Sequence, residues 1–164
     1  RICFHVNIPC FSSCFHVTYF QSPEIYHHSL CPPQLAECVL VVEEAWVEWE
    51  SASATGQAYL AACTPAEVDS YLAGPLEPST RHTVVDPDLL RARIAEVRER
   101  GWSVNPEGLS DGIAAVGAPV LGPDGRPVGA LSVSGPIHRF GHDRVPEAAA
   151  LLRAAADGIG GTLA

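Results

Sequence analysis

Two extended runs separated by a tight glycine turn constrain the fold of this chain more than any other feature. Residues 112–121 are small and β-branched, which suits a strand with close neighbours. Gly122-Pro123-Asp124-Gly125 is typical of a hairpin turn, and residues 127–135 read as the returning strand. A short extended segment at 102–104 and turn chemistry at 105–108 come before them. The sequence therefore predicts an antiparallel arrangement of strands.

The returning strand has two faces of different chemistry. Because side chains alternate along a strand, Ser132 and Ser134 share one face, whereas Leu131 and Val133 share the other. The apolar face suits a covering helix. The face with the two hydroxyls carries only small side chains at its centre, which leaves room for a closely packed element or for a ligand.

Helix signals surround these strands. We predict helices over 53–63, over 65–73 after a capping-box sequence, over 87–100, and from about residue 144 to about residue 157, with a fraying tail. The order helix, helix, helix, strand, hairpin, helix predicts an α+β fold, in which an antiparallel sheet carries its helices mainly on one side.

Composition changes abruptly near residue 50. All fourteen glycines lie at Gly56 or later, while five of the six cysteines lie in the first 38 residues. Apolar alternation nevertheless predicts strands over 2–8, 15–19 and 38–42, with a loop at His27-His28. We therefore expect residues 1–164 to form a single domain that opens with these strands.

The residue identities of 1–50 admit two interpretations. We hypothesise that these identities are unreliable, either because the reading frame is shifted or because residues were assigned by their shape in density. The alternative interpretation is a truly divergent N-terminus. If they hold, the cysteines and histidines raise the question of a metal. Only Cys10 and Cys14 have the close spacing of a structural zinc pair, so we predict no metal site. Nothing signals export, so we expect no disulfide framework either.

Three motifs after residue 50 carry a family resemblance. Residues 52–60, Ala-Ser-Ala-Thr-Gly-Gln-Ala-Tyr-Leu, resemble the Ala-x-Gly-Lys-Ala-Leu-Leu helix of IclR-type transcriptional regulators. Residues 101–120 look like that family's Gly-Tyr-x-x-Asp-x-Glu…Gly…Ala-Ala-Pro-Val segment, and Leu-Ser-Val-Ser-Gly-Pro at 131–136 is similar to its last-strand signature. The motifs occur in the family's order, and the resemblance covers about residues 51–160.

The resemblance implies a C-terminal effector-binding domain with a GAF/profilin-like fold. In such regulators a small organic effector, carboxylic or aromatic acids among them, modulates how a dimer or tetramer binds its operator. The family's N-terminal winged helix-turn-helix is expected to be absent here, because fifty residues are too few for it and the opening strands. A net charge of −9, with ten arginines and no lysine, also argues against this chain holding DNA by itself. We expect a cytoplasmic protein without cofactor or membrane segment.

The resemblance also implies effector-binding residues. A helix N-terminus offers free N–H groups to an anion, and serine hydroxyls can donate to a carboxylate. Other roles stay open for these residues. Thr55 would serve as a helix cap, Asn105 as a turn residue, and the hydroxyls of Ser132 and Ser134 would bond to neighbouring backbone. Ser51 and Gln57 depart from the family, which often has His and Lys there. The six candidates are Ala54, Thr55, Asn105, Ala115, Ser132 and Ser134.

An enzyme is the alternative to a sensor. The sequence contains no Gly-x-Ser-x-Gly elbow, no phosphate-binding glycine loop and no His-Glu-x-x-His helix, so we predict no catalytic activity. A free-standing GAF-like hydrolase or thiol enzyme would have to use groups such as Cys63 or His138. A sealed oligomerisation module is the third class we consider.

Overall fold

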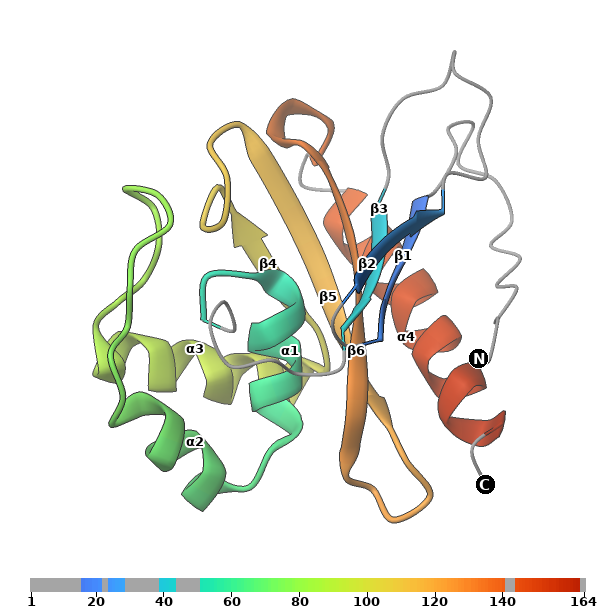
Figure 1. The fold of residues 1–164 in the computed structure, drawn as a ribbon, viewed down its shortest axis with the longest axis horizontal. Helices are drawn as coiled ribbons and strands as arrows, with labels where there is room; N and C mark the ends of the chain where they lie inside the picture. Colours follow the sequence, from blue (N-terminus) through green and yellow to red (C-terminus); the bar gives the residue numbers. More distant parts are fainter. Residues whose placement is uncertain (1–15, 22–23, 29–38, 44–50, 141–143, 163–164) are drawn as a thin grey trace.

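The computed structural model describes residues 16–21, 24–28, 39–43, 51–140 and 144–162, and its sheet combines strands from both sides of residue 50. The strand order is β2-β1-β3-β6-β5-β4 (Figure 1). All neighbouring strands run antiparallel except β1 and β3, which are parallel, so the expected antiparallel sheet contains one parallel pair. The strands are β1 (His16–Gln21), β2 (Glu24–His28), β3 (Val39–Glu43), β4 (Ser103–Pro106), β5 (Ile113–Leu121) and β6 (Pro127–Pro136).

The predicted hairpin is the centre of this sheet. β5 and β6 pair along nearly their whole length, with Gly117 opposite Ser132. The turn closes through a 2.8 Å hydrogen bond from the Gly122 N–H to the Arg126 carbonyl, and Gly125 has a φ of 75° that suits glycine. Asn105, expected in a turn, instead lies within the edge strand β4, one residue before its end.

The helices begin where their caps predict. Ser53 caps α1 (Ala54–Ala62), Thr64 and Glu67 form a capping box on α2 (Pro65–Leu72), and Asp86 caps α3 (Pro87–Arg100). After β6 come the short 3-10 helix η1 (Ile137–Arg139) and α4 (Arg144–Thr162). None of the described helices is both long and apolar enough to cross a membrane.

The last helix is longer than predicted. The predicted helix ends near residue 157 with a fraying tail, but α4 continues to Thr162. Its extra turn is held by packing: Ile159 is buried against the sheet, and the Thr162 hydroxyl donates a 2.7 Å hydrogen bond to the Ile159 carbonyl. Burial of an apolar side chain thus outweighs the low helix propensity of glycine here.

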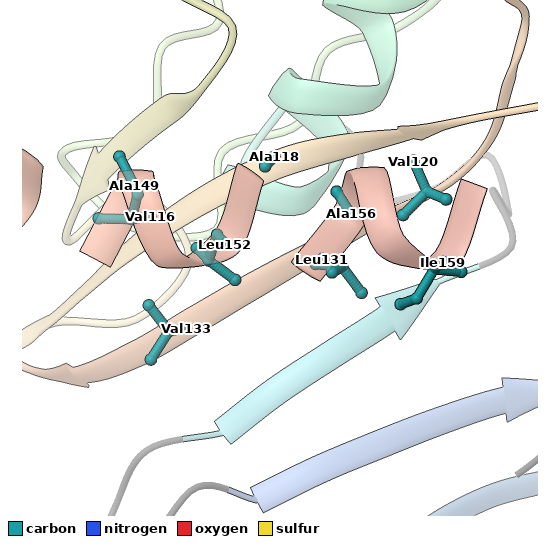
Figure 2. Packing of buried hydrophobic residues seen from close by; sticks show 9 residues of the cluster. All are labelled: Val116, Ala118, Val120, Leu131, Val133, Ala149, Leu152, Ala156 and Ile159. Carbon is teal, nitrogen blue, oxygen red and sulfur yellow. The ribbon is translucent and has the colours of Figure 1, made fainter. Parts of the chain in front are cut away.

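Described helices lie on both faces of the sheet, with α4 on one side and α1, α2 and α3 on the other (Figure 1). α4 covers the apolar face: Figure 2 shows its Leu152 and Ile159 against side chains of β5 and β6. α1 lies on the opposite face of the same two strands, with α3 and α2 packed outside it. The α+β fold with helices mainly on one side is confirmed. The small-residue face of β6 leaves room for a closely packed element, and that element is α1.

The predictions for the first fifty residues have mixed outcomes. Strands β1 and β3 match two of the predicted alternating runs, and β1 pairs with both β2 and β3. The strand predicted at 2–8 lies outside the described residues. The loop predicted at His27-His28 is wrong, because both residues belong to β2. The candidate zinc pair Cys10 and Cys14 also lies outside the described part of the chain.

Candidate functional site

A pair of hydroxyl groups joins the start of α1 to the middle of β6. Thr55 Oγ1 donates a hydrogen bond of 2.9 Å to Ser132 Oγ, and both side chains are buried, at 4% and 3% exposure. Because each hydroxyl has one proton, Ser132 accepts from Thr55 and keeps its own proton for a further acceptor. The contact therefore presents an O–H donor inside the layer between α1 and the sheet.

The N-terminus of α1 lies beside this pair. The Ser53 hydroxyl accepts a 2.9 Å hydrogen bond from the Gly56 N–H, and the Ser53 carbonyl accepts from the Gln57 N–H. The N–H groups of Ala54 and Thr55 have no hydrogen-bond partner within the described residues. Free amides at a helix start, together with the helix dipole, favour an anion.

The edge strand β4 holds this helix start in place. Ser103 Oγ donates a 2.6 Å hydrogen bond to the Ala54 carbonyl, and Asn105 Nδ2 donates to the Ala52 carbonyl. Asn105 Oδ1 in turn accepts from the Gly108 N–H at 3.1 Å. Two buried side chains of β4 thus fix the backbone on both sides of the Ser53 cap.

Gly117 of β5 allows this close approach. A Cβ atom placed on it would lie 2.5 Å from the Ala54 carbonyl oxygen and 2.7 Å from Ser103 Oγ. Such distances are too short for real carbon contacts, so only glycine lets α1 lie this near the strand. The sequence analysis did not select Ser103 or Gly117. Strand alternation could have found both, because they share a face with Ser132. Gly117 of β5 pairs with Ser103 of β4 on one side and with Ser132 of β6 on the other.

The six predicted residues all lie on this side of the sheet or at the start of α1. Ala115 pairs with Asn105 on one side and with Ser134 on the other, which places the three in one row. Ser134 is half-buried and, unlike Ser132, has no hydrogen bond from its side chain to the described residues. Their role in binding a ligand stays a prediction; their common location is what the structure establishes.

The structure shows which hydrogen bonds three of these residues make. Ser53, not Thr55, caps α1, so the Thr55 hydroxyl is free to reach Ser132. Ser132 bonds to this side chain rather than to neighbouring backbone. Asn105 does serve the following turn through Gly108, and it also ties that turn to the start of α1.

The two residues that depart from the family pattern, Ser51 and Gln57, are hydrogen-bonded to each other. Gln57 is 1% exposed, and its Nε2 donates a 2.8 Å hydrogen bond to the Ser51 carbonyl. Its Oε1 is buried without a hydrogen-bond partner in the described part of the chain. An unpaired buried carbonyl oxygen opposes folding, since it loses its hydration.

Cys63 and His138, the residues that an enzyme would have to use, lie away from the hydroxyl pair. Cys63 ends α1 and packs against the cluster between α1, α2 and α3, and its carbonyl accepts a 2.8 Å hydrogen bond from Arg98. His138 is exposed in η1, after the end of β6. Neither residue takes part in the hydrogen bonds that link α1 to β4 and β6.

Among the ionisable groups of the described residues, Glu67 and Arg100 have shifted pKa values, and both lie outside this site. The pKa of Glu67 is lowered, first by the hydrogen bond from the Thr64 backbone N–H and then by the Thr64 hydroxyl. Burial lowers the pKa of Arg100, whose guanidinium lies 4.2 Å from the centre of the Trp102 ring and donates to the Trp102 carbonyl. Both groups stabilise helix ends rather than a reactive centre.

Comparisons with known proteins agree with this architecture. The family model described as bacterial transcriptional regulator IclR, C-terminal, matches residues 51–160. The transcriptional repressor IclR of Escherichia coli is 35% identical over 106 residues, which are 64% of this chain and 39% of that protein. The structure of an IclR-type regulator from Silicibacter superposes with a TM-score of 0.72 at 31% identity, covering 90% of this chain and 58% of the other.

A further solved structure bears on the fold alone. The inducer-binding domain of the PobR transcription factor of Acinetobacter, crystallised as a double mutant with 3-hydroxybenzoic acid, has a TM-score of 0.62 at 21% identity over 68% of this chain and 66% of that one.

The fold and these matches define a domain of a bacterial transcriptional regulator. The chain belongs to the IclR family and corresponds to its C-terminal domain. It spans well under half the length of the Escherichia coli repressor, and such relatives are named regulators rather than enzymes.

Proposed function

We propose that this domain binds a small organic acid between the start of α1 and the hydroxyl face of β6. The observation that carries the proposal is the buried Thr55–Ser132 hydroxyl pair next to the Ala54 and Thr55 N–H groups, which have no hydrogen-bond partner among the described residues. The carboxylate would accept from those amides and from the Ser132 hydroxyl, with Ser134 and Ala115 farther along the same face. Asn105 would act by holding the start of α1.

The chemical class of the ligand follows from this donor set. All of the groups offered are hydrogen-bond donors without formal charge, and α1 has neither an acidic nor a basic residue in its first turn. Such a site suits one carboxylate attached to a small apolar body. An aromatic acid fits this description, and PobR is an example of a related fold that binds one, 3-hydroxybenzoic acid.

In the whole protein we propose that this binding modulates operator recognition. A DNA-binding domain outside this chain would contact DNA, and the regulator would act in the cytoplasm as a homodimer or homotetramer. A ligand that replaces the Thr55–Ser132 bond would shift α1 relative to β6, and it could alter the equilibrium between arrangements only by binding one of them more tightly.

A panel of small acids tests the proposal. Benzoate, 3-hydroxybenzoate and short aliphatic carboxylates are each added to the purified domain in a thermal shift assay, with the matching amides as controls. A ligand at 100 times its Kd stabilises a protein by about 2.7 kcal/mol, which such an assay resolves. We expect at least one acid, and not its amide, to raise the melting temperature without being consumed. Turnover of the acid would favour the enzyme alternative, and no shift with any acid would contradict the proposal.

A further inference from the structure

A second group of chemically active side chains lies on the surface, away from the hydroxyl pair. His82 belongs to the segment between α2 and α3, while Glu107 and Asp111 belong to the turn between β4 and β5. One ligand atom from each residue lies within 4.8 Å of the others, and His82 Nε2 is 3.8 Å from Glu107 Oε2. The sequence analysis predicted no metal site and did not select these residues.

The two segments are fastened together before any ion binds. Thr80 Oγ1 donates to the Glu107 carbonyl, and Thr83 Oγ1 donates to the Gly108 carbonyl, each at 2.6 Å. Within the turn, Glu107 Oε1 accepts a 2.9 Å hydrogen bond from the Gly112 N–H, which leaves Oε2 facing His82. Because these contacts already order the backbone, ligand binding need not order the two loops first.

The charges in the group are incompletely balanced. Asp111 is exposed and has no hydrogen bond or ion pair with the described residues, and the one basic side chain close to the Glu107 carboxylate among them is His82, at 3.8 Å. Arg81 is the neighbouring cation, and its Nε donates a 2.9 Å hydrogen bond to His82 Nε2, which therefore acts as an acceptor. An ion bound through Nε2 would have to displace this arginine, whereas one bound through Nδ1 would not.

We propose that His82, Glu107 and Asp111 bind one divalent transition-metal ion, with Zn²⁺ as the representative. One imidazole and two carboxylates are typical zinc donors, and the imidazole disfavours Mg²⁺ and Ca²⁺. Zinc–ligand bonds of about 2.0–2.2 Å bring tetrahedral ligands to roughly 3.3 Å from one another. The three partly exposed side chains reach that spacing by small rotations, and water completes the coordination.

An ion at this position would stiffen the support of α1. Gly108 follows Glu107, and its N–H donates to Asn105, whose amide holds the Ala52 carbonyl ahead of α1. The metal site itself stands apart from the proposed function, because Zn²⁺ binding is measured directly and its failure would leave the proposed acid site untouched.

Zn²⁺ titration calorimetry on the whole chain tests the proposal. Cysteines and other histidines bind zinc as well, so each variant is compared with the native chain. We expect His82→Ala and Glu107→Gln each to lose one equivalent of Zn²⁺ or to bind it at least about tenfold more weakly. His138→Ala, which removes an exposed histidine outside the group, should keep that equivalent, and so should Arg81→Ala, which leaves all three ligands. Circular dichroism checks that each variant is folded.

Equal zinc binding by His82→Ala and His138→Ala would overturn the proposal, as would a native chain that binds no zinc. Crystals soaked in Zn²⁺ give a second test of the metal site, which does not depend on any variant. An anomalous scattering peak between His82, Glu107 and Asp111 is the expected result, and soaked crystals without a peak there would also overturn it.

Discussion

Thr55 and Ser132 lie 77 residues apart in the chain and share a buried 2.9 Å hydrogen bond. This bond connects the first turn of α1 to the centre of β6, the strand whose opposite face packs on α4. It is a link between the two layers of the domain as well as the centre of the proposed acid site.

Removing one partner of this bond should destabilise the domain. Thr55→Val keeps the shape of the side chain but leaves the buried Ser132 hydroxyl without its donor. We expect a loss of about 1–3 kcal/mol in the free energy of unfolding, measured by urea denaturation. Ser132→Ala and the double variant complete a mutant cycle, in which the double variant should lose less than the sum of the singles. Strictly additive losses would show that the two hydroxyls do not interact.

Gly117 should tolerate no side chain. Gly117→Ala places a carbon 2.5 Å from the Ala54 carbonyl oxygen, so α1 must move away from the sheet. We expect a loss of about 1–3 kcal/mol, typical of an overpacked interior. Gly158→Ala is the matched control, because Gly158 is exposed within α4 and a Cβ there meets nothing within 4 Å. That variant should gain up to about 1 kcal/mol from helix propensity. Equal effects at the two positions would refute the close approach of α1.

The capping box on α2 should make stability depend on pH. The pKa of Glu67 is lowered below its ordinary value of 4.5 by hydrogen bonds from Thr64, so the folded state favours the ionised carboxylate. The stabilisation is therefore complete above about pH 4.5 and is lost as the pH falls through the lower folded-state pKa. Glu67→Gln should be less stable than the native chain at neutral pH and approach it in acid. Glu77→Gln, at an exposed glutamate outside the capping box, is the matched control for the substitution itself. A stability gap between Glu67→Gln and the native chain that stays constant with pH would contradict the assignment.

Local signals in the sequence predicted the elements well where each signal acts within a few residues. Ser53, Thr64 and Asp86 begin helices because a side-chain oxygen can accept from backbone N–H groups two or three residues on. The hairpin turn was found for the same reason. The length of α4 was missed because the burial of Ile159 depends on strands distant in sequence.

The candidate site was predicted as a set of positions but not as a set of contacts. Family motifs pointed to Thr55 and Ser132, yet neither periodicity nor spacing reveals that their hydroxyls meet. Strand alternation places Ser103 and Gly117 on the face of Ser132, but their contact with the Ala54 carbonyl involves a backbone atom that carries no sequence signal. His82 and Glu107 approach one another only because the threonines of one segment bond to the next turn.

The change of composition near residue 50 leads to a prediction about the true residue identities of positions 1–50. The family match begins at residue 51, five residues before the first glycine, Gly56. We expect peptide mass mapping of the purified protein to fail to match residues 1–50 as printed. No lysine or arginine lies between Arg1 and Arg81, so a protease specific for acidic or aromatic residues is needed beside trypsin. Peptides that match this stretch as printed would establish a truly divergent N-terminus.

The central claim is that the hydroxyl face of β6 and the start of α1 bind an organic acid. Calorimetry with the acid that gives the largest thermal shift, on the native domain and on Ser132→Ala/Ser134→Ala, tests it most directly, with Ser110→Ala as an exposed control. We expect the double variant to stay folded and to bind the acid at least about tenfold more weakly, a loss of about 1.4 kcal/mol, while the control binds as the native domain does. A folded double variant with unchanged affinity would show that the acid does not bind at this face.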